Sequence, residues 1–168
     1  MTRRITVAMI ASATAIGLAG VSTADAGPSA KTYKATLTAV KPAAATAGVP
    51  KVAGRAELVD GKKRNTVSLH MRRLAPSTSY LWHVHEGTCA ATGAPVAGWT
   101  YRTQTGGNGT LTSDSSGVAN TNGRSRTFNA GSGKRYSVNV HVAADTNGVA
   151  AGTIIACGDL KRSKSKGA

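Results

Sequence analysis

Short runs in which apolar and polar residues alternate recur along most of this chain. Successive side chains of a β-strand point to opposite faces, so the alternation predicts strands that are buried on one face. The runs are rich in Val, Thr and Tyr, and turn-forming Gly, Asn, Asp and Ser separate them. No run after Lys31 has a convincing helical period. The predicted strands cover residues 34–40, 53–59, 66–74, 83–85, 109–112, 118–122, 135–142 and 152–160.

About eight strands at this spacing predict an all-β fold, either a Greek-key sandwich or a barrel. Residues 114–117 read Asp-Ser-Ser-Gly and predict a hairpin turn between the flanking strands, with Gly117 supplying a positive φ angle. Residues 42–50 are expected to be a connection, and the long segment 87–107 is expected to be irregular.

Residues 1–26 are predicted to be a signal peptide. Arg3 and Arg4 precede an apolar run of small residues, and Ala24-Asp25-Ala26 is a cleavage signal of the A-x-A type. The run is short for a membrane span, so cleavage is favoured over anchoring, and no transmembrane segment is expected in the mature chain. The general secretory route and the twin-arginine route both remain open. The mature protein is expected to be secreted, periplasmic or in the cell envelope.

Residues 27–160 are predicted to form one β domain, followed by a basic, disordered tail over 161–168. The chain has 21 Lys and Arg against 7 Asp and Glu, a formal charge of +14. This charge favours anionic partners, either a small anion or anionic polymers of the cell envelope. Nucleic acid is not expected, because aromatic residues make up only 4% of the chain and the basic residues are scattered.

The chain has two cysteines, Cys89 and Cys157. In an exported protein the simplest expectation is that they form one disulfide. The alternative is a thiolate metal ligand of the blue-copper kind, which needs a nearby methionine. The only methionine outside the predicted signal peptide is Met71. The disulfide is therefore favoured.

Two histidines, His83 and His85, are two residues apart in a predicted strand and therefore project from the same face. They make half of an imidazole metal site on a rigid element. His141 lies in another alternating run, and a fold that returned it to this strand would add a third imidazole. The remaining histidine, His70, is expected to be at the surface.

The order of these motifs resembles the copper/zinc superoxide dismutase family over roughly residues 34–160. The matching pieces are the His83-Val84-His85-Glu86 run with a cysteine soon after it, the segment 112–119, Val140-His141 followed by Asp145, and Ala156-Cys157-Gly158. The resemblance implies an eight-stranded Greek-key fold of that type.

The resemblance also implies roles for individual residues. His83, His85 and His141 match three copper ligands of the family, and Cys89 and Cys157 match its disulfide. Asp145 matches the carboxylate that orients the metal-bound imidazoles.

Other positions depart from the family pattern. No histidine occurs in residues 93–99, where the ligand that bridges copper and zinc is expected, and residues 98–109 lack the further zinc ligands. The resemblance therefore implies copper and no zinc of the family kind. The position of the active-site arginine is Ile154. Arg102, Lys134 and Arg135 are substitutes only in being cationic.

The expected function is that of a secreted, copper-only enzyme that converts superoxide to oxygen and hydrogen peroxide. Reduced activity is expected, because water or Glu86 would have to deliver the protons. The alternative is a non-catalytic copper-binding or envelope protein on the same fold. A third hypothesis is a hydrolytic zinc site at the three histidines, with Glu86 as the base.

Overall fold

The computed structural model describes residues 30–61, 63–102, 109–131, 133–144 and 148–163, and strands dominate it. The strands are β1 (Lys31–Ala39), β2 (Ala53–Asp60), β3 (Asn65–Arg72), β4 (Ser79–Thr88), β5 (Ala91–Pro95), β6 (Trp99–Arg102), β7 (Thr110–Thr112), β8 (Ala119–Ser125), β9 (Tyr136–Val142), β10 (Ile154–Asp159) and β11 (Lys161–Arg162). The predicted all-β class is confirmed.

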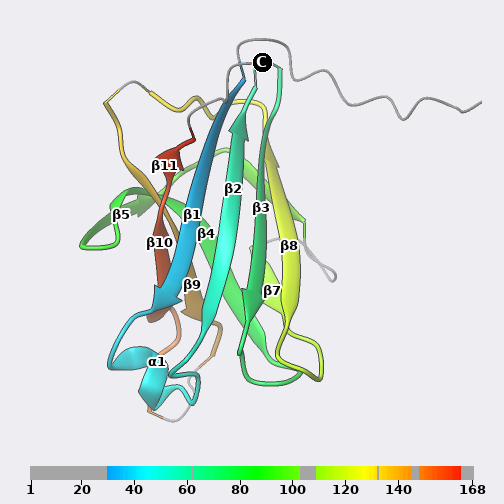
Figure 1. The fold of residues 1–168 in the computed structure, drawn as a ribbon, viewed down its shortest axis with the longest axis vertical. Helices are drawn as coiled ribbons and strands as arrows, with labels where there is room; N and C mark the ends of the chain where they lie inside the picture. The colour runs from blue at the N-terminus through cyan, green and yellow to red at the C-terminus, as the bar shows by residue number, and fades with distance from the viewer. Residues whose placement is uncertain (1–29, 62, 103–108, 132, 145–147, 164–168) are drawn as a thin grey trace, which may run out of the picture.

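All strand pairs are antiparallel and belong to one sheet, in the order β5-β4-β9-β10-β1-β2-β3-β8-β6. Two short strands lie off this path, because β7 pairs with β4 and β11 pairs with β1. The sheet curls on itself, and Figure 1 shows β4 and β9 running behind the layer that β1, β2, β3 and β8 form. The result is a half-barrel with two opposed walls.

The core fills the space between these walls. Alternate residues of the strands are buried there, as the hydrophobic pattern predicts; Leu37 and Leu58 come from one wall, and Trp82 and Val138 from the other. All four side chains are at most 1% exposed. Burying a side chain of this size stabilises the fold by roughly 1.5–3 kcal/mol. The other face of β4 and β9 is left for polar residues.

Two connecting segments differ from the sequence-based expectation. A one-turn helix, α1 (Ala43–Thr46), occupies the connection over 42–50. The segment 87–107, expected to be irregular, contains β5 and β6. β5 (Ala-Thr-Gly-Ala-Pro) shows little hydrophobic alternation, and β6 (Trp-Thr-Tyr-Arg) alternates over four residues only, so the periodicity missed both strands. Both strands pair at the edges of the sheet, β5 with β4 and β6 with β8, and Trp99 of β6 also packs against the core.

The hairpin predicted around residues 114–117 is wrong, although its turn is present. Gly117 has a φ of 75°, and its N–H donates to the carbonyl of Asp114. The flanking strands do not pair with each other, because β7 pairs with β4 and β8 pairs with β3. The turn instead takes the chain from one wall of the half-barrel to the other.

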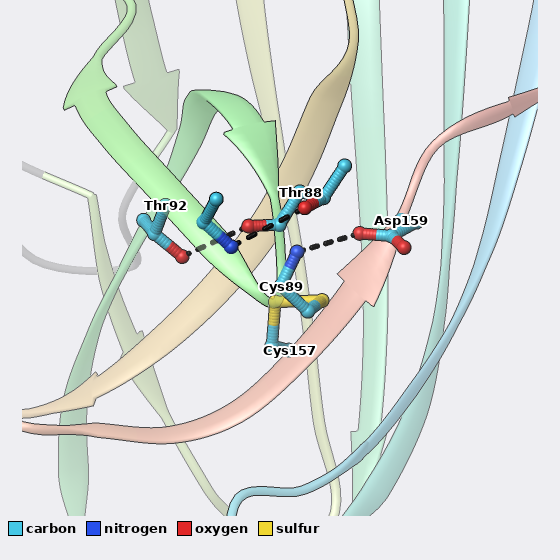
Figure 2. Close-up of a disulfide and its surroundings, with 6 residues drawn as sticks. Thr88, Cys89, Thr92, Cys157 and Asp159 are labelled. Carbon is cyan, nitrogen blue, oxygen red and sulfur yellow. Dashed lines mark hydrogen bonds between the residues drawn. A yellow bond between two sulfur atoms is a disulfide. The ribbon is translucent and has the colours of Figure 1, made fainter.

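Cys89 and Cys157 form a disulfide, as predicted, with their Cα atoms 5.8 Å apart. This excludes the alternative in which a cysteine is a thiolate ligand. The bond joins the segment after β4 to β10, and the N–H of Cys89 also donates to Asp159 Oδ1 at 2.7 Å (Figure 2). Both contacts fasten the loop between β4 and β5 to the last long strand.

The structure describes only part of the segments predicted at the two ends of the chain. The predicted signal peptide lies outside the described residues, and Lys161 and Arg162 at the start of the predicted tail form β11 with exposed side chains. No helix among the described residues is long and apolar enough to cross a membrane.

Replacing both cysteines with alanine is expected to lower the free energy of unfolding by about 4 kcal/mol, because the bond closes a loop of 68 residues in the unfolded chain. Guanidinium denaturation of the metal-free protein measures this. A double variant with the stability of the oxidised parent would contradict the prediction.

Candidate metal centre

Three histidines lie on the same face of the β4–β9 pair. His83 and His85 are on β4, and the register places His83 directly opposite Asn139 and Leu81 directly opposite His141. His141 is therefore the diagonal neighbour of His83. The alternating partners, Trp82 and Val84, point into the core and are 0% exposed. Core burial thus fixes the face on which the histidines project.

The three imidazoles converge. His83, His85 and His141 each offer a ligand nitrogen, and these atoms all lie within 4.8 Å of one another. The ring centroids are 5.3–5.9 Å apart. Two nitrogens bound to one ion at about 2.1 Å each lie at most about 4.2 Å apart, so small ring rotations would close the set on an ion. Among the described residues, this is the one cluster of three or more His, Cys, Asp or Glu side chains with metal-binding geometry.

Backbone carbonyls orient two of the rings. His85 Nδ1 lies 3.0 Å from the carbonyl oxygen of Gly93, and His141 Nδ1 lies 2.9 Å from that of Gly152. A carbonyl can only accept, so both Nδ1 atoms donate and both Nε2 atoms keep a lone pair. Each Nε2 is buried and has no hydrogen-bond partner. This is the arrangement of a metal-binding imidazole, in which the second nitrogen is held by a backbone acceptor.

The site favours neutral imidazoles. Burial, followed by the neighbouring His141 and His85, lowers the pKa of His83 to about 4. Burial also lowers the pKa of His141, although its bond to the Gly152 carbonyl opposes the shift. At neutral pH these rings are therefore unprotonated, which a metal ligand must be.

Several residues considered from the sequence lie elsewhere. Glu86 is exposed, and its carboxylate binds Lys134 at 2.7 Å, which raises the pKa of that lysine. Strand alternation places Glu86 on the face of β4 opposite to His83 and His85. Arg135 is exposed.

Asp145 lies outside the described residues, and so does the side chain of Arg102. His70 is half-buried on β3, where it hydrogen-bonds Asn120. It is not a member of the histidine cluster.

An apolar side chain stands beside His141. Ile154 on β10 pairs directly with His141, and directly paired residues share a face of the sheet. Ile154 is half-buried. The family resemblance assigns an arginine to this position, whereas in this chain an aliphatic side chain lies next to His141.

Two buried polar residues near the histidines were missed by the sequence reasoning. Ser137 and Asn139 are 0% exposed, and their side-chain hydroxyl and amide atoms have no hydrogen-bond partner. The available signal was their position, since both have the same strand parity as His141 and alternate with core valines. A buried polar group without a partner costs about 1–3 kcal/mol.

Family models and curated proteins were compared with this chain, and none of them matches it.

Gly109→Ala is expected to weaken metal binding at least tenfold, because Gly109 has a φ of 70° and lies against the His83 ring. An added methyl group would overlap the carbonyl oxygen of Trp82 and stand 3.2 Å from His83 Nε2. Competition titration with a chelator measures the affinity. Gly133→Ala is the control, because Gly133 also has a positive φ but has no atom within 4 Å of an added methyl group. Equal affinities would contradict the prediction.

The metal-free protein is expected to lose stability as the pH falls from about 6.5 to 4. In this interval the unfolded chain binds a proton at His83 and the folded chain does not, so acid favours unfolding. Melting temperatures between pH 4 and pH 7 measure this. His83→Gln is expected to reduce the slope of the profile in this interval and to leave the contribution of His141, and an unchanged profile would contradict the assignment.

Proposed function

We propose that this chain is an exported copper-binding protein of the superoxide dismutase type. The convergence of His83, His85 and His141 supports the proposal most directly. The connections from β3 to β4 and from β7 to β8 join strands that are not neighbours, as a Greek-key topology requires. The disulfide supports export, because such bonds persist in oxidising compartments.

We propose that the bound metal is copper. Imidazole nitrogens suit copper, zinc, iron and nickel, so the donors alone leave several ions open. The zinc ligands expected from the family resemblance are absent from the sequence, and three histidines leave a position open for a small ligand. A copper ion there would supply one-electron chemistry, in which one superoxide is oxidised to oxygen and a second, with two protons, is reduced to hydrogen peroxide.

The chain itself would contribute positioning and charge. The carbonyls of Gly93 and Gly152 hold His85 and His141 with Nε2 directed to the common centre. A formal charge of +14 raises the concentration of a small anion near the protein. These contributions do not require an acid or a base at the site.

The surroundings of the histidines favour slow turnover. Glu86, the one acid considered for proton delivery, is bound to Lys134, and Ile154 offers no charge beside His141. Water would then supply the protons. Glu86 is also on the face of β4 opposite to His83 and His85, so it is badly placed to be the general base of a hydrolytic zinc site, and we rank that hypothesis last.

The second candidate function is copper binding without turnover, at the cell envelope. The apolar Ile154 beside the site favours it. The β1–β11 edge adds a cationic surface, since Lys31, Lys34 and Arg162 line a concavity of about 680 Å³ that also contains Glu57. Such a surface would attract anionic envelope polymers, and its binding to them should weaken as salt rises.

Copper-loaded protein is expected to accelerate superoxide decay relative to the variant in which His83, His85 and His141 are all alanine, as measured by stopped-flow absorbance. Equal decay rates, with copper bound to the parent protein, would contradict the catalytic function and support copper binding without turnover.

Ile154→Arg is expected to raise this rate about tenfold at low ionic strength, because the new cation would attract the anion directly beside His141. Ile154→Gln is the neutral control and should not raise the rate. The gain should shrink with added salt, and a gain that persists in high salt would contradict an electrostatic cause.

A further inference from the structure

Asn139 lies at the centre of the face that holds the histidines. The register places it directly opposite His83 on β4 and directly opposite Cys157 on β10. It is also two residues before His141 on β9, on the same side of the strand. His83 and His141 are therefore immediate neighbours of Asn139, and Cys157 of the disulfide lies beside it on β10.

Ser137 is the next residue of β9 on the same face as Asn139, and it is also polar. It lies directly opposite His85 on β4 and opposite Asp159 on β10. Both Asn139 and Ser137 are 0% exposed. The strand floor beneath the three imidazoles is thus lined by a carboxamide and a hydroxyl rather than by aliphatic side chains.

The polar atoms of this floor have no partner in the fold. The carboxamide oxygen and nitrogen of Asn139 and the hydroxyl of Ser137 are all buried without a hydrogen bond. Buried polar groups are almost always satisfied, and the exceptions are found where a water, an ion or a ligand binds. A leucine or a valine at position 139 would be the ordinary choice for the middle of a buried strand.

Elsewhere the same protein hydrogen-bonds a buried asparagine through both the oxygen and the nitrogen of its carboxamide. Asn65 is 4% exposed, donates its amide to the carbonyl of Phe128, and accepts the N–H of Gly61 at 2.8 Å. Asn65 therefore has a structural role that the fold itself explains. Asn139 has no such role among the described residues, and its neighbours are metal-ligand candidates.

We propose that Asn139 and Ser137 form a polar floor of the metal centre that hydrogen-bonds a small hydroxylic ligand of the bound ion, a water or a hydroxide. The carboxamide can donate and accept, as can the hydroxyl, so together they can hold one water molecule in a fixed orientation. This inference rests on the proposed metal binding at His83, His85 and His141, and it adds binding residues to that site.

The proposal predicts opposite effects of one substitution on stability and on metal binding. Asn139→Leu keeps the side-chain size and removes two unpaired polar atoms, so the metal-free protein should melt at the same or a higher temperature. The same variant should bind Cu(II) at least tenfold more weakly and give an altered electron paramagnetic resonance spectrum. Ser137→Ala should change affinity in the same direction by a smaller factor, and it tests the hydroxyl independently of the carboxamide.

The matched control is Asn65→Leu. It should lower the melting temperature, because it leaves the Gly61 N–H and the Phe128 carbonyl without their partner, and it should leave Cu(II) affinity and the spectrum unchanged. An affinity and a spectrum unchanged in both Asn139→Leu and Ser137→Ala would overturn the polar floor while metal binding stands. A marked loss of melting temperature in metal-free Asn139→Leu would also overturn it, because the carboxamide would then be structural. A parent protein that binds no Cu(II) would overturn the metal centre and the floor together.

Discussion

The antiparallel pairing of β4 with β9 is the constraint on which the candidate site depends. Its register brings His141, which is far away in sequence, next to His83 and His85 on one face. Burial of Trp82 on the opposite face fixes that register. A shift of β4 by one residue would move its two histidines into the core, so core packing and site geometry are set by the same interaction.

The polar face of the β4–β9 pair destabilises the folded state. Its buried imidazole nitrogens and the unpaired groups of Asn139 and Ser137 oppose folding, and the disulfide and the apolar core compensate. A bound ion would satisfy the imidazole nitrogens and thereby stabilise the folded state by mass action. Metal binding should therefore raise the free energy of unfolding of this protein, because the three ligands lie close together in the folded state and not in the unfolded chain.

Sequence periodicity predicted the all-β class and the strands that supply the core, because one-sided burial leaves a clear alternation. It missed β5 and β6, two short edge strands, because β5 has little hydrophobic alternation and β6 has only four residues. Local turn chemistry placed Gly117 correctly but could not show that the flanking strands pair with β4 and β3 instead of with each other. Strand parity predicted that His83 and His85 share a face, whereas the carbonyl partners Gly93 and Gly152 depend on loops whose paths no local pattern determines.

The most direct test is the metal content of the exported, oxidised protein, measured by elemental analysis with electron paramagnetic resonance on the same sample. The account predicts one copper per chain, little zinc, and a nitrogen-ligated Cu(II) signal that disappears when His83, His85 and His141 are replaced by alanine. A protein with an intact disulfide that takes up no copper even after reconstitution would contradict it.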